Sequence, residues 1–198
     1  MAYKSILVHL NSIKDRWAKV DVAAGRLVDN EQSLTTLAKG LDGINQGNNT
    51  ILELSQQAAQ QIGQGGGTLR EVEFANQLAV LSQRIAKNAN AIASGDEVDP
   101  EVAFLLGKDA GTFRDVLTGL TRGSEPLRLA AVRNEDARAT LGELAKRFAN
   151  YEQGVNAILQ NMQRLTVAKQ SARSINNESE ALLQEALDPR RPVVRVGP

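Results

Sequence analysis

The sequence has no cysteine, a single histidine and few aromatic residues. Without cysteine, the chain can form neither a disulfide nor a thiolate metal site. His9 has no second histidine to pair with, and a general base needs a positioned partner. Aromatic residues are only 4% of the chain, whereas compact enzymes usually use more of them to line pockets. We therefore predict no enzymatic activity, no catalytic residue, no metal site and no cofactor.

The sequence also lacks long apolar runs and an excess of charge of either sign. No run reaches the roughly 18–20 residues that a membrane span needs, and the first residues lack the pattern of a signal peptide. Lys and Arg number 23, as do Asp and Glu, so the surface has no general attraction for nucleic acid or anionic lipid. We expect the given chain to be soluble and to bind no nucleic acid.

What the sequence does contain is helical periodicity. In every segment between glycine and proline breaks, apolar residues recur at steps of three and four. This pattern predicts an all-α protein, an elongated antiparallel helical bundle with long coiled-coil-like helices. The helical segments are expected at about 5–27, 30–62, 69–94, 100–122 and 134–187.

The first two segments differ in how clearly they are delimited. One apolar stripe is predicted along the first segment, formed by Leu10, Ile13, Trp17, Val20, Ala24 and Leu27. Asp29 and Gln32 resemble a capping box, which predicts a break near residues 28–31, although a straight helix is equally compatible. In the second segment, Gly40, Gly43 and Gly47 lower helix propensity by about 1 kcal/mol each relative to alanine, so packing must supply the difference.

Turn and capping patterns separate the middle segments. Residues 63–67 read GQGGG, a run that favours a chain reversal, and they lack the Gly-Lys-Ser/Thr ending of a phosphate loop. Thr68 and Glu71 then fit a capping box. Asp99 and Pro100 fit the cap and first position of the next helix.

The last segment has the most regular heptad pattern, and it predicts one helix from residue 134 to 187, about 80 Å long. Its seam turns polar beyond Met162, where Lys169 and Asn176 stand at core positions. This part is expected to pack loosely or to pair with something outside the chain. Residues 188–198 contain three prolines and are expected to be an unstructured tail.

Polar residues line one margin of the apolar stripe in the third segment. Gln77, Arg84 and Asn88 project near one another, and Gln83 lies on an adjacent face. An arginine and amides in this position can bind an anion or a partner across a helix interface. They can also be ordinary flanking residues whose stems cover the core. Composition alone favours this second interpretation. Because Arg84 lies at the margin of the stripe, its truncation is expected to cost at most about 1 kcal/mol of stability.

Three stretches of the chain resemble a known family. LAVLSQRIAKNA, residues 78–89, resembles the motif of the PilJ-type sensory domain, found in the transducer of type IV pilus chemotaxis and, in a related form, in nitrate/nitrite sensor kinases. GKDAGTFRDVLTGLTRG, residues 107–123, resembles the second helix of that module. RWAKVDVAAGRLVDNEQSLTTL, residues 16–37, resembles its connecting helix. The order of the three stretches is more specific than the motif alone.

The resemblance implies a periplasmic ectodomain of an inner-membrane receptor that controls twitching motility and surface sensing. Its implied partners are pilin or another pilus-associated periplasmic protein, and a second copy in a homodimer. Residues 10–67 would form the connecting helices and 68–187 the sensory module, with 1–9 and 188–198 as candidates for foreign sequence. Two alternatives stay open: a small-anion sensor related to the nitrate kinases, with Arg84 as the matching ligand residue, and a structural coiled-coil spacer.

Overall fold

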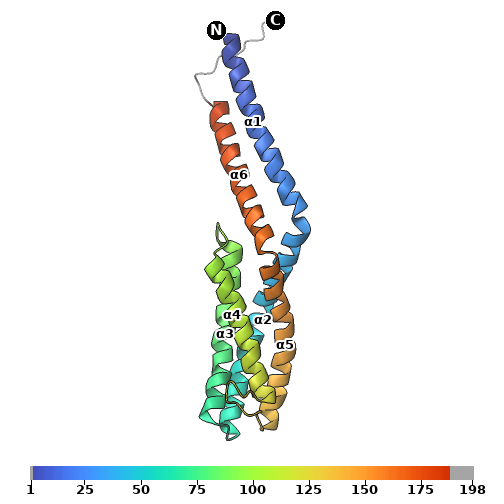
Figure 1. The fold of residues 1–198 in the computed structure, drawn as a ribbon, viewed down its shortest axis with the longest axis vertical. Helices are drawn as coiled ribbons and strands as arrows, with labels where there is room; N and C mark the ends of the chain where they lie inside the picture. Colours follow the sequence, from blue (N-terminus) through green and yellow to red (C-terminus); the bar gives the residue numbers. More distant parts are fainter. Residues whose placement is uncertain (1, 188–198) are drawn as a thin grey trace. The chain divides into compact units, whose positions relative to one another are not determined.

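The computed structural model describes residues 2–187, with side chains from Leu7 onward, and these residues form six helices. The only β pairing within them is an isolated bridge between Ser124 and Leu129. The predicted all-α fold is therefore confirmed, whereas the predicted tail at 188–198 lies outside the described residues. The helices are α1 (Ala2–Asp29), α2 (Glu31–Gln64), α3 (Leu69–Ser94), α4 (Pro100–Arg122), α5 (Glu135–Gln160) and α6 (Met162–Leu187) (Figure 1).

The chain divides into two compact units. Residues 33–163 form one, which we call the bundle unit. The described parts of 1–32 and 164–198 form the other, which we call the terminal unit, and each is described by itself. This division follows from contacts between residues and does not test the expected boundary between connecting helices and a sensory module at residue 67. That boundary stays a prediction.

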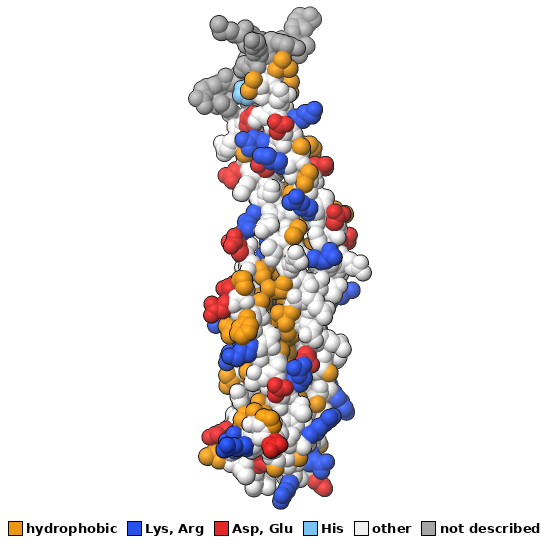
Figure 2. Space-filling view, in the orientation of Figure 1, with side chains coloured by type: hydrophobic (Ala, Val, Ile, Leu, Met, Phe, Trp, Pro, Cys, Tyr) orange, Lys and Arg blue, Asp and Glu red, His pale blue; other side chains and the backbone are white. Residues whose placement is uncertain are grey.

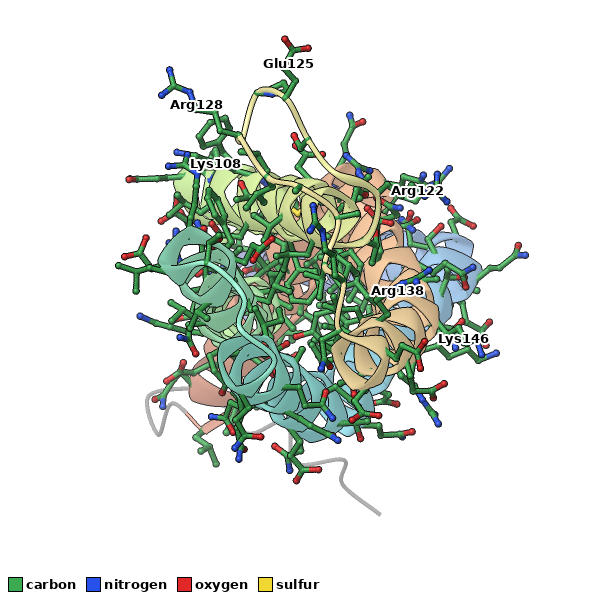
Figure 3. All side chains as sticks on the ribbon, turned by 90° about the horizontal axis from the view of Figure 1, so that it is seen from below. Lys108, Arg122, Glu125, Arg128, Arg138 and Lys146 are labelled. Atoms are coloured by element: carbon green, nitrogen blue, oxygen red, sulfur yellow. The ribbon has the colours of Figure 1, made fainter. Side chains whose placement is uncertain are left out.

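The bundle unit is made of α2, α3, α4 and α5, which run antiparallel to one another in chain order (Figure 1). Phe113 and Phe148 stack at its centre with ring centroids 4.1 Å apart. Charged side chains such as Arg122 and Lys146 point away from the bundle (Figure 3). The largest fully buried side chains are Ile44, Ile51, Ile62, Leu78, Ile85, Ile92, Leu106, Phe113, Leu120, Leu141, Leu144 and Tyr151.

The predicted caps of α3 and α4 are confirmed. The Glu71 backbone N–H donates to the Thr68 side chain, and the Thr68 N–H donates to the Glu71 carboxylate, which completes the capping box. Asp99 caps α4 by accepting from the Glu101 N–H, and Pro100 occupies the first turn. Short-range rules were sufficient here because each cap involves residues only two or three positions apart.

Gly40 and Gly47 of α2 face α5. A Cβ built on Gly40 would lie 2.9 Å from the carbonyl oxygen of Gly154, so the two backbones touch only because both residues are glycine. Gly47 lies against the Tyr151 ring. Gly43 has no neighbour within 4 Å, and nothing in the structure explains the absence of a side chain there.

The predicted single helix at 134–187 is wrong, because the helix is interrupted at Asn161. There the backbone leaves helical geometry (φ −103°, ψ 10°), and the N–H bonds back to Ile158. The Asn161 amide also donates to the carbonyl oxygen of Ala157, four residues earlier, and asparagine competes for backbone groups in this way. The break expected near residues 28–31 is confirmed at Asn30, whose amide donates to the carbonyl of Arg26 in the same pattern.

In the terminal unit, α1 and α6 are paired by polar contacts in one antiparallel register. His9 contacts Glu185 at 3.4 Å, Arg16 donates to Glu178 at 3.0 Å, and Arg164 donates to Asn30 at 3.1 Å. His9 and Arg16 belong to α1, and Asn30 directly follows it. These three positions are separated by seven and fourteen residues, and so are their partners in reverse order. This heptad spacing defines the seam between the two helices.

The apolar stripe predicted for α1 is partly wrong. Ile13, Val20 and Leu27 are half-buried, but Leu10 and Trp17 are exposed. The seam that forms instead alternates these apolar residues with the polar positions of His9, Arg16 and Asn30. Pattern reasoning placed Leu10 and Trp17 inside because it assumed that every apolar residue would face one neighbour.

On the face shown in Figure 2, basic and acidic side chains are interspersed, in line with the equal numbers of the two charges. Within the part of the chain that the structure describes, no helix combines the length and the apolar character needed to cross a membrane.

Candidate functional site

The centre of α3 connects to all three other helices of the bundle unit through three consecutive residues. Ser82 is contacted from α5, Gln83 faces α2, and Arg84 binds α4. Consecutive residues of a helix are about 100° apart around its axis. A three-residue stretch in a central position can therefore reach three different neighbours.

The Ser82 contact is buried. The Tyr151 hydroxyl of α5 donates to the backbone carbonyl of Ser82 in α3 at 3.0 Å. The Tyr151 hydroxyl lies 3.3 Å from the Asn48 amide oxygen as well. Burial raises the pKa of Tyr151, so the phenol stays protonated and available as a donor. A buried Tyr hydroxyl normally requires such a partner.

Two amide pairs join α2 to α3 near this contact. Gln83 and Asn48 lie within 3.5 Å of each other, and Asn90 donates to Asn45 at 2.8 Å. Asn48 thus contacts both Gln83 and Tyr151. The Asn48–Tyr151 contact is partly buried, and a partly buried polar contact favours one helix register because a shifted register would leave it unpaired.

The Arg84 contact is an ion pair with unequal partners. The guanidinium lies 2.9 Å from one carboxylate oxygen of Asp109, yet the Arg84 side chain is 50% exposed while that of Asp109 is only 3% exposed. The second oxygen, Oδ2, is buried without a hydrogen-bond partner among the described residues. Burial raises the pKa of Asp109, while Arg84 and Lys108 oppose that rise. Arg84 is thus the nearest compensation for a buried charge.

The structure separates the four predicted binding residues. Gln83 and Arg84 are directed to different helices, and both already have partners. Gln77 is exposed and Asn88 is half-buried, and neither has a side-chain hydrogen bond within the described residues. Their binding role stays a prediction.

Sequence reasoning missed Asp109, the buried partner of Arg84. A pattern could have revealed it, since Asp109 lies three residues after Leu106 and four before Phe113, both buried in α4. A carboxylate within such a stripe needs a cation or a proton. The contact between Tyr151 and Asn48 was also missed, because it depends on how α2 and α5 pack.

In residues 2–187, no three His, Cys, Asp or Glu side chains come together in a way that could hold a metal ion. The arrangement instead couples four helices through a small number of polar contacts.

Comparison with known proteins gives two relatives. The chain is 29% identical over 123 residues, 62% of its length, to Protein PilJ of Pseudomonas aeruginosa. It is 26% identical over 117 residues, 59% of its length, to a protein of Alcanivorax borkumensis named for methyl-accepting chemotaxis, AlkN. The chain is related to the PilJ-type chemotaxis transducers. No family model matches it.

The PilJ-type relationship covers a small part of each relative. The matched region spans 18% of the length of PilJ and 17% of that of AlkN. The relationship confirms the resemblance inferred from the motif stretches. What the complete receptors sense and bind belongs to a proposal for this chain.

Proposed function

We propose that the chain is a non-catalytic sensory domain of a type IV pilus chemoreceptor. Its parent would be anchored in the inner membrane, with this region in the periplasm, and its input would be pilin or another pilus-associated protein. The relationship to PilJ supports this proposal. The observation that carries it is the connection of Ser82, Gln83 and Arg84 to three different helices.

Such a centre suits transmission of a packing change. A partner that displaces one helix of the bundle unit alters a contact to α3, and α3 is in contact with the other two helices. Bundles with two discrete packings can carry coupling over tens of ångströms, since packed interfaces switch between arrangements instead of deforming continuously. Gln77 and Asn88 would contact the partner, because they lie on α3 with their amide groups unengaged within the described residues.

A homodimer would complete the terminal unit. On α1 the side chains of Leu10, Trp17 and Val28 are exposed, and so are Leu183 and Leu187 on α6. Two helices alone bury little apolar surface, and a second pair covering these residues would bury more. Because Trp17 is the single tryptophan, its emission should shift to shorter wavelength as protein concentration rises. Unchanged emission over a range where sedimentation detects dimers would place the interface elsewhere.

The small-anion alternative rests on the half-exposed guanidinium of Arg84. An anion there would have to compete with Asp109, which would then lose its cation and take up a proton. Calorimetric titration of the purified chain with nitrate tests this alternative. A heat of nitrate binding that is measured for the unmodified chain and lost in Arg84→Gln would favour anion sensing over pilin sensing.

The main proposal is tested in the natural host with the complete receptor. Arg84→Gln should abolish surface-dependent twitching while the receptor's abundance, measured by immunoblot, stays normal. Lys87→Gln is the matched control, because Lys87 is an exposed cation on the same helix and should leave twitching unchanged. Pull-down of pilin by the purified chain, and its loss in Gln77→Ala, tests the partner separately.

Two outcomes would contradict the proposal. Normal twitching of Arg84→Gln at normal abundance would show that the Arg84 contact is not needed for signalling. Absence of any response or partner in all assays would leave the chain as a structural spacer. If the Arg84→Gln receptor fails to accumulate, the double variant Arg84→Gln/Asp109→Asn also removes the buried charge. This double variant should fold and allows the same twitching assay.

A further inference from the structure

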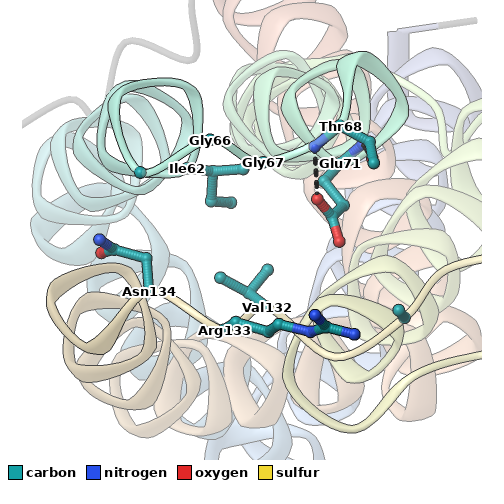
Figure 4. Close-up of a pocket in the computed structure, with 10 residues that line it drawn as sticks. Ile62, Gly66, Gly67, Thr68, Glu71, Val132, Arg133 and Asn134 are labelled. Atoms are coloured by element: carbon teal, nitrogen blue, oxygen red, sulfur yellow. Dashed lines mark hydrogen bonds between the residues drawn. The ribbon is translucent and has the colours of Figure 1, made fainter.

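A cavity of about 450 Å³ lies where the α2–α3 turn of the bundle unit meets the loop between α4 and α5. One wall is the turn between α2 and α3, and the other is the end of the loop that leads into α5. Figure 4 shows Ile62 and Val132 pointing toward each other across it. In this view Glu71 and Arg133 lie on the same side, and both residues line the cavity.

Contacts within the bundle unit hold both walls in place. The Arg70 side chain donates to the Leu127 carbonyl at 2.9 Å, and the Val132 N–H donates to the Leu120 carbonyl at 2.9 Å. A Cβ on Gly65 would lie 2.6 Å from the Asn134 side chain, so this turn can approach α5 only as glycine. The cavity is therefore formed before any ligand arrives, which lowers the entropic cost of binding.

The lining carries one positive and one negative charge. Glu71 is positioned by the capping box, which engages one carboxylate oxygen with the Thr68 N–H. Arg133 is exposed and has no ion-pair partner within the described residues. A ligand with a single charge would leave one of the two unmatched, whereas a zwitterion matches both.

We propose that this cavity binds a free α-amino acid. The ligand carboxylate pairs with the Arg133 guanidinium, and its ammonium pairs with the Glu71 carboxylate. An α-amino acid carries both charges at one end, in keeping with charged groups on one side of the cavity, and its side chain lies against Ile62 and Val132. The site is separate from the Ser82–Arg84 contacts and adds a small-molecule input to the proposed sensory function.

Binding is measured by NMR titration of the isotope-labelled chain with L-alanine, L-valine and L-glutamine, a small, a branched and a polar probe. At least one should shift the backbone amide resonances of residues 65–71 and 132–134, with a Kd on the order of 1 mM or tighter. 3-Methylbutanoate and isobutylamine are valine without its amine and without its carboxylate, respectively. Each analogue should bind at least about tenfold more weakly than valine.

Two variants locate the site. Glu71→Gln removes the charge but keeps a residue that can form the capping box, and Arg133→Met removes the guanidinium with little loss of length. Each should weaken binding about tenfold or more. Arg138→Met is the matched control, because Arg138 is an exposed cation of α5 outside the cavity (Figure 3), and binding should be unchanged.

Three results would overturn the proposal: no shift with any of the three amino acids, equal binding of the singly charged analogues, or full binding by both cavity variants. None of them bears on the twitching phenotype of Arg84→Gln, so failure of this inference is distinguishable from failure of the proposed function.

Discussion

The bundle unit and the terminal unit are both antiparallel helical assemblies, but they are held together differently. In the bundle unit, large apolar side chains are fully buried among four helices, and the buried polar contacts include those of Ser82 and Asp109 near the middle of α3. In the terminal unit, the seam of α1 with α6 alternates half-buried Ile13, Val20 and Leu27 with partnered polar residues. Apolar burial stabilises the bundle unit. In the terminal unit, the polar contacts fix the register of α1 against α6 more than they add stability.

The difference suits two tasks. A unit with a tightly packed core keeps a binding surface or cavity in shape, because interiors of this density resist deformation. A two-helix unit with few buried side chains opens at low free energy, as weakly packed regions do. We therefore expect the terminal unit to open at a lower free energy than the bundle unit.

The largest effect should come from a charge placed in the apolar core of the bundle unit. Leu144 is fully buried, so Leu144→Asp should destabilise the chain by several kcal/mol or unfold it. The same holds for Ile158→Asp. Leu183→Asp, at an exposed position of α6, should change stability by less than about 1 kcal/mol. Thermal unfolding followed by circular dichroism would measure this, and similar melting of the Leu144 and Leu183 variants would contradict the comparison.

Next in size is the Arg84–Asp109 pair. The structure changes the expectation that truncating Arg84 costs at most about 1 kcal/mol, since Arg84→Gln leaves a buried carboxylate uncompensated and should cost about 3 kcal/mol. Asp109→Asn leaves only a half-exposed guanidinium and should cost less. The double variant should resemble Asp109→Asn in a denaturant-unfolding cycle. Additive costs would mean that the pair does not interact.

Alanine substitutions at two glycines of α2 should have smaller effects on stability, with opposite signs. Gly40→Ala places a methyl group 2.9 Å from the Gly154 carbonyl oxygen, beside backbone that cannot rotate away, and should cost about 1–3 kcal/mol. Gly43→Ala has open space and should stabilise by about 0.5–1 kcal/mol through helix propensity. Urea unfolding would compare them, and equal effects would show that α2 and α5 do not touch at Gly40.

The smallest effect is on pH dependence, where the two units should respond with opposite sign. The raised pKa of Asp109 means that the folded state binds its proton more tightly, so its contribution improves as pH falls from that pKa toward 3.8. Hydrogen bonding to Lys19, followed by that to Arg16, lowers the pKa of Glu178. Its stabilising contribution is therefore complete above 4.5 and is lost as pH falls through the lowered value. Carboxyl-carbon NMR titration would show both, and a depressed Asp109 pKa would contradict the burial argument.

Local sequence rules predicted much of this fold. Helical periodicity located the segments, and the caps at Thr68 and Asp99 followed from residues two or three positions away. The interruption at Asn161 was missed because the heptad pattern continues across it, from Val155 to Met162. A single asparagine that bonds to the preceding turn ended the helix without changing the apolar pattern.

Of the ion pair between Arg84 and Asp109, the sequence analysis identified only Arg84 as a candidate. Arg84 was singled out because an arginine beside amides at the margin of an apolar stripe can bind an anion or a partner across a helix interface. That it binds Asp109 of α4, and that Gln83 turns to α2, depend on the packing of helices separated by turns. Side-chain spacing along one helix does not determine which neighbour lies against each face.

By itself, the sequence determined the helical class, the turns and caps, the balanced charge and the relationship to the PilJ-type transducers, because each follows from composition, short-range spacing or similarity. Tertiary structure alone decided that Arg84 meets Asp109, that Gly40 meets Gly154, that Trp17 faces outward, and that Glu71 and Arg133 line one cavity. These features join residues tens of positions apart or depend on which face a helix presents, and that choice is made by the combined burial of all the helices in a unit.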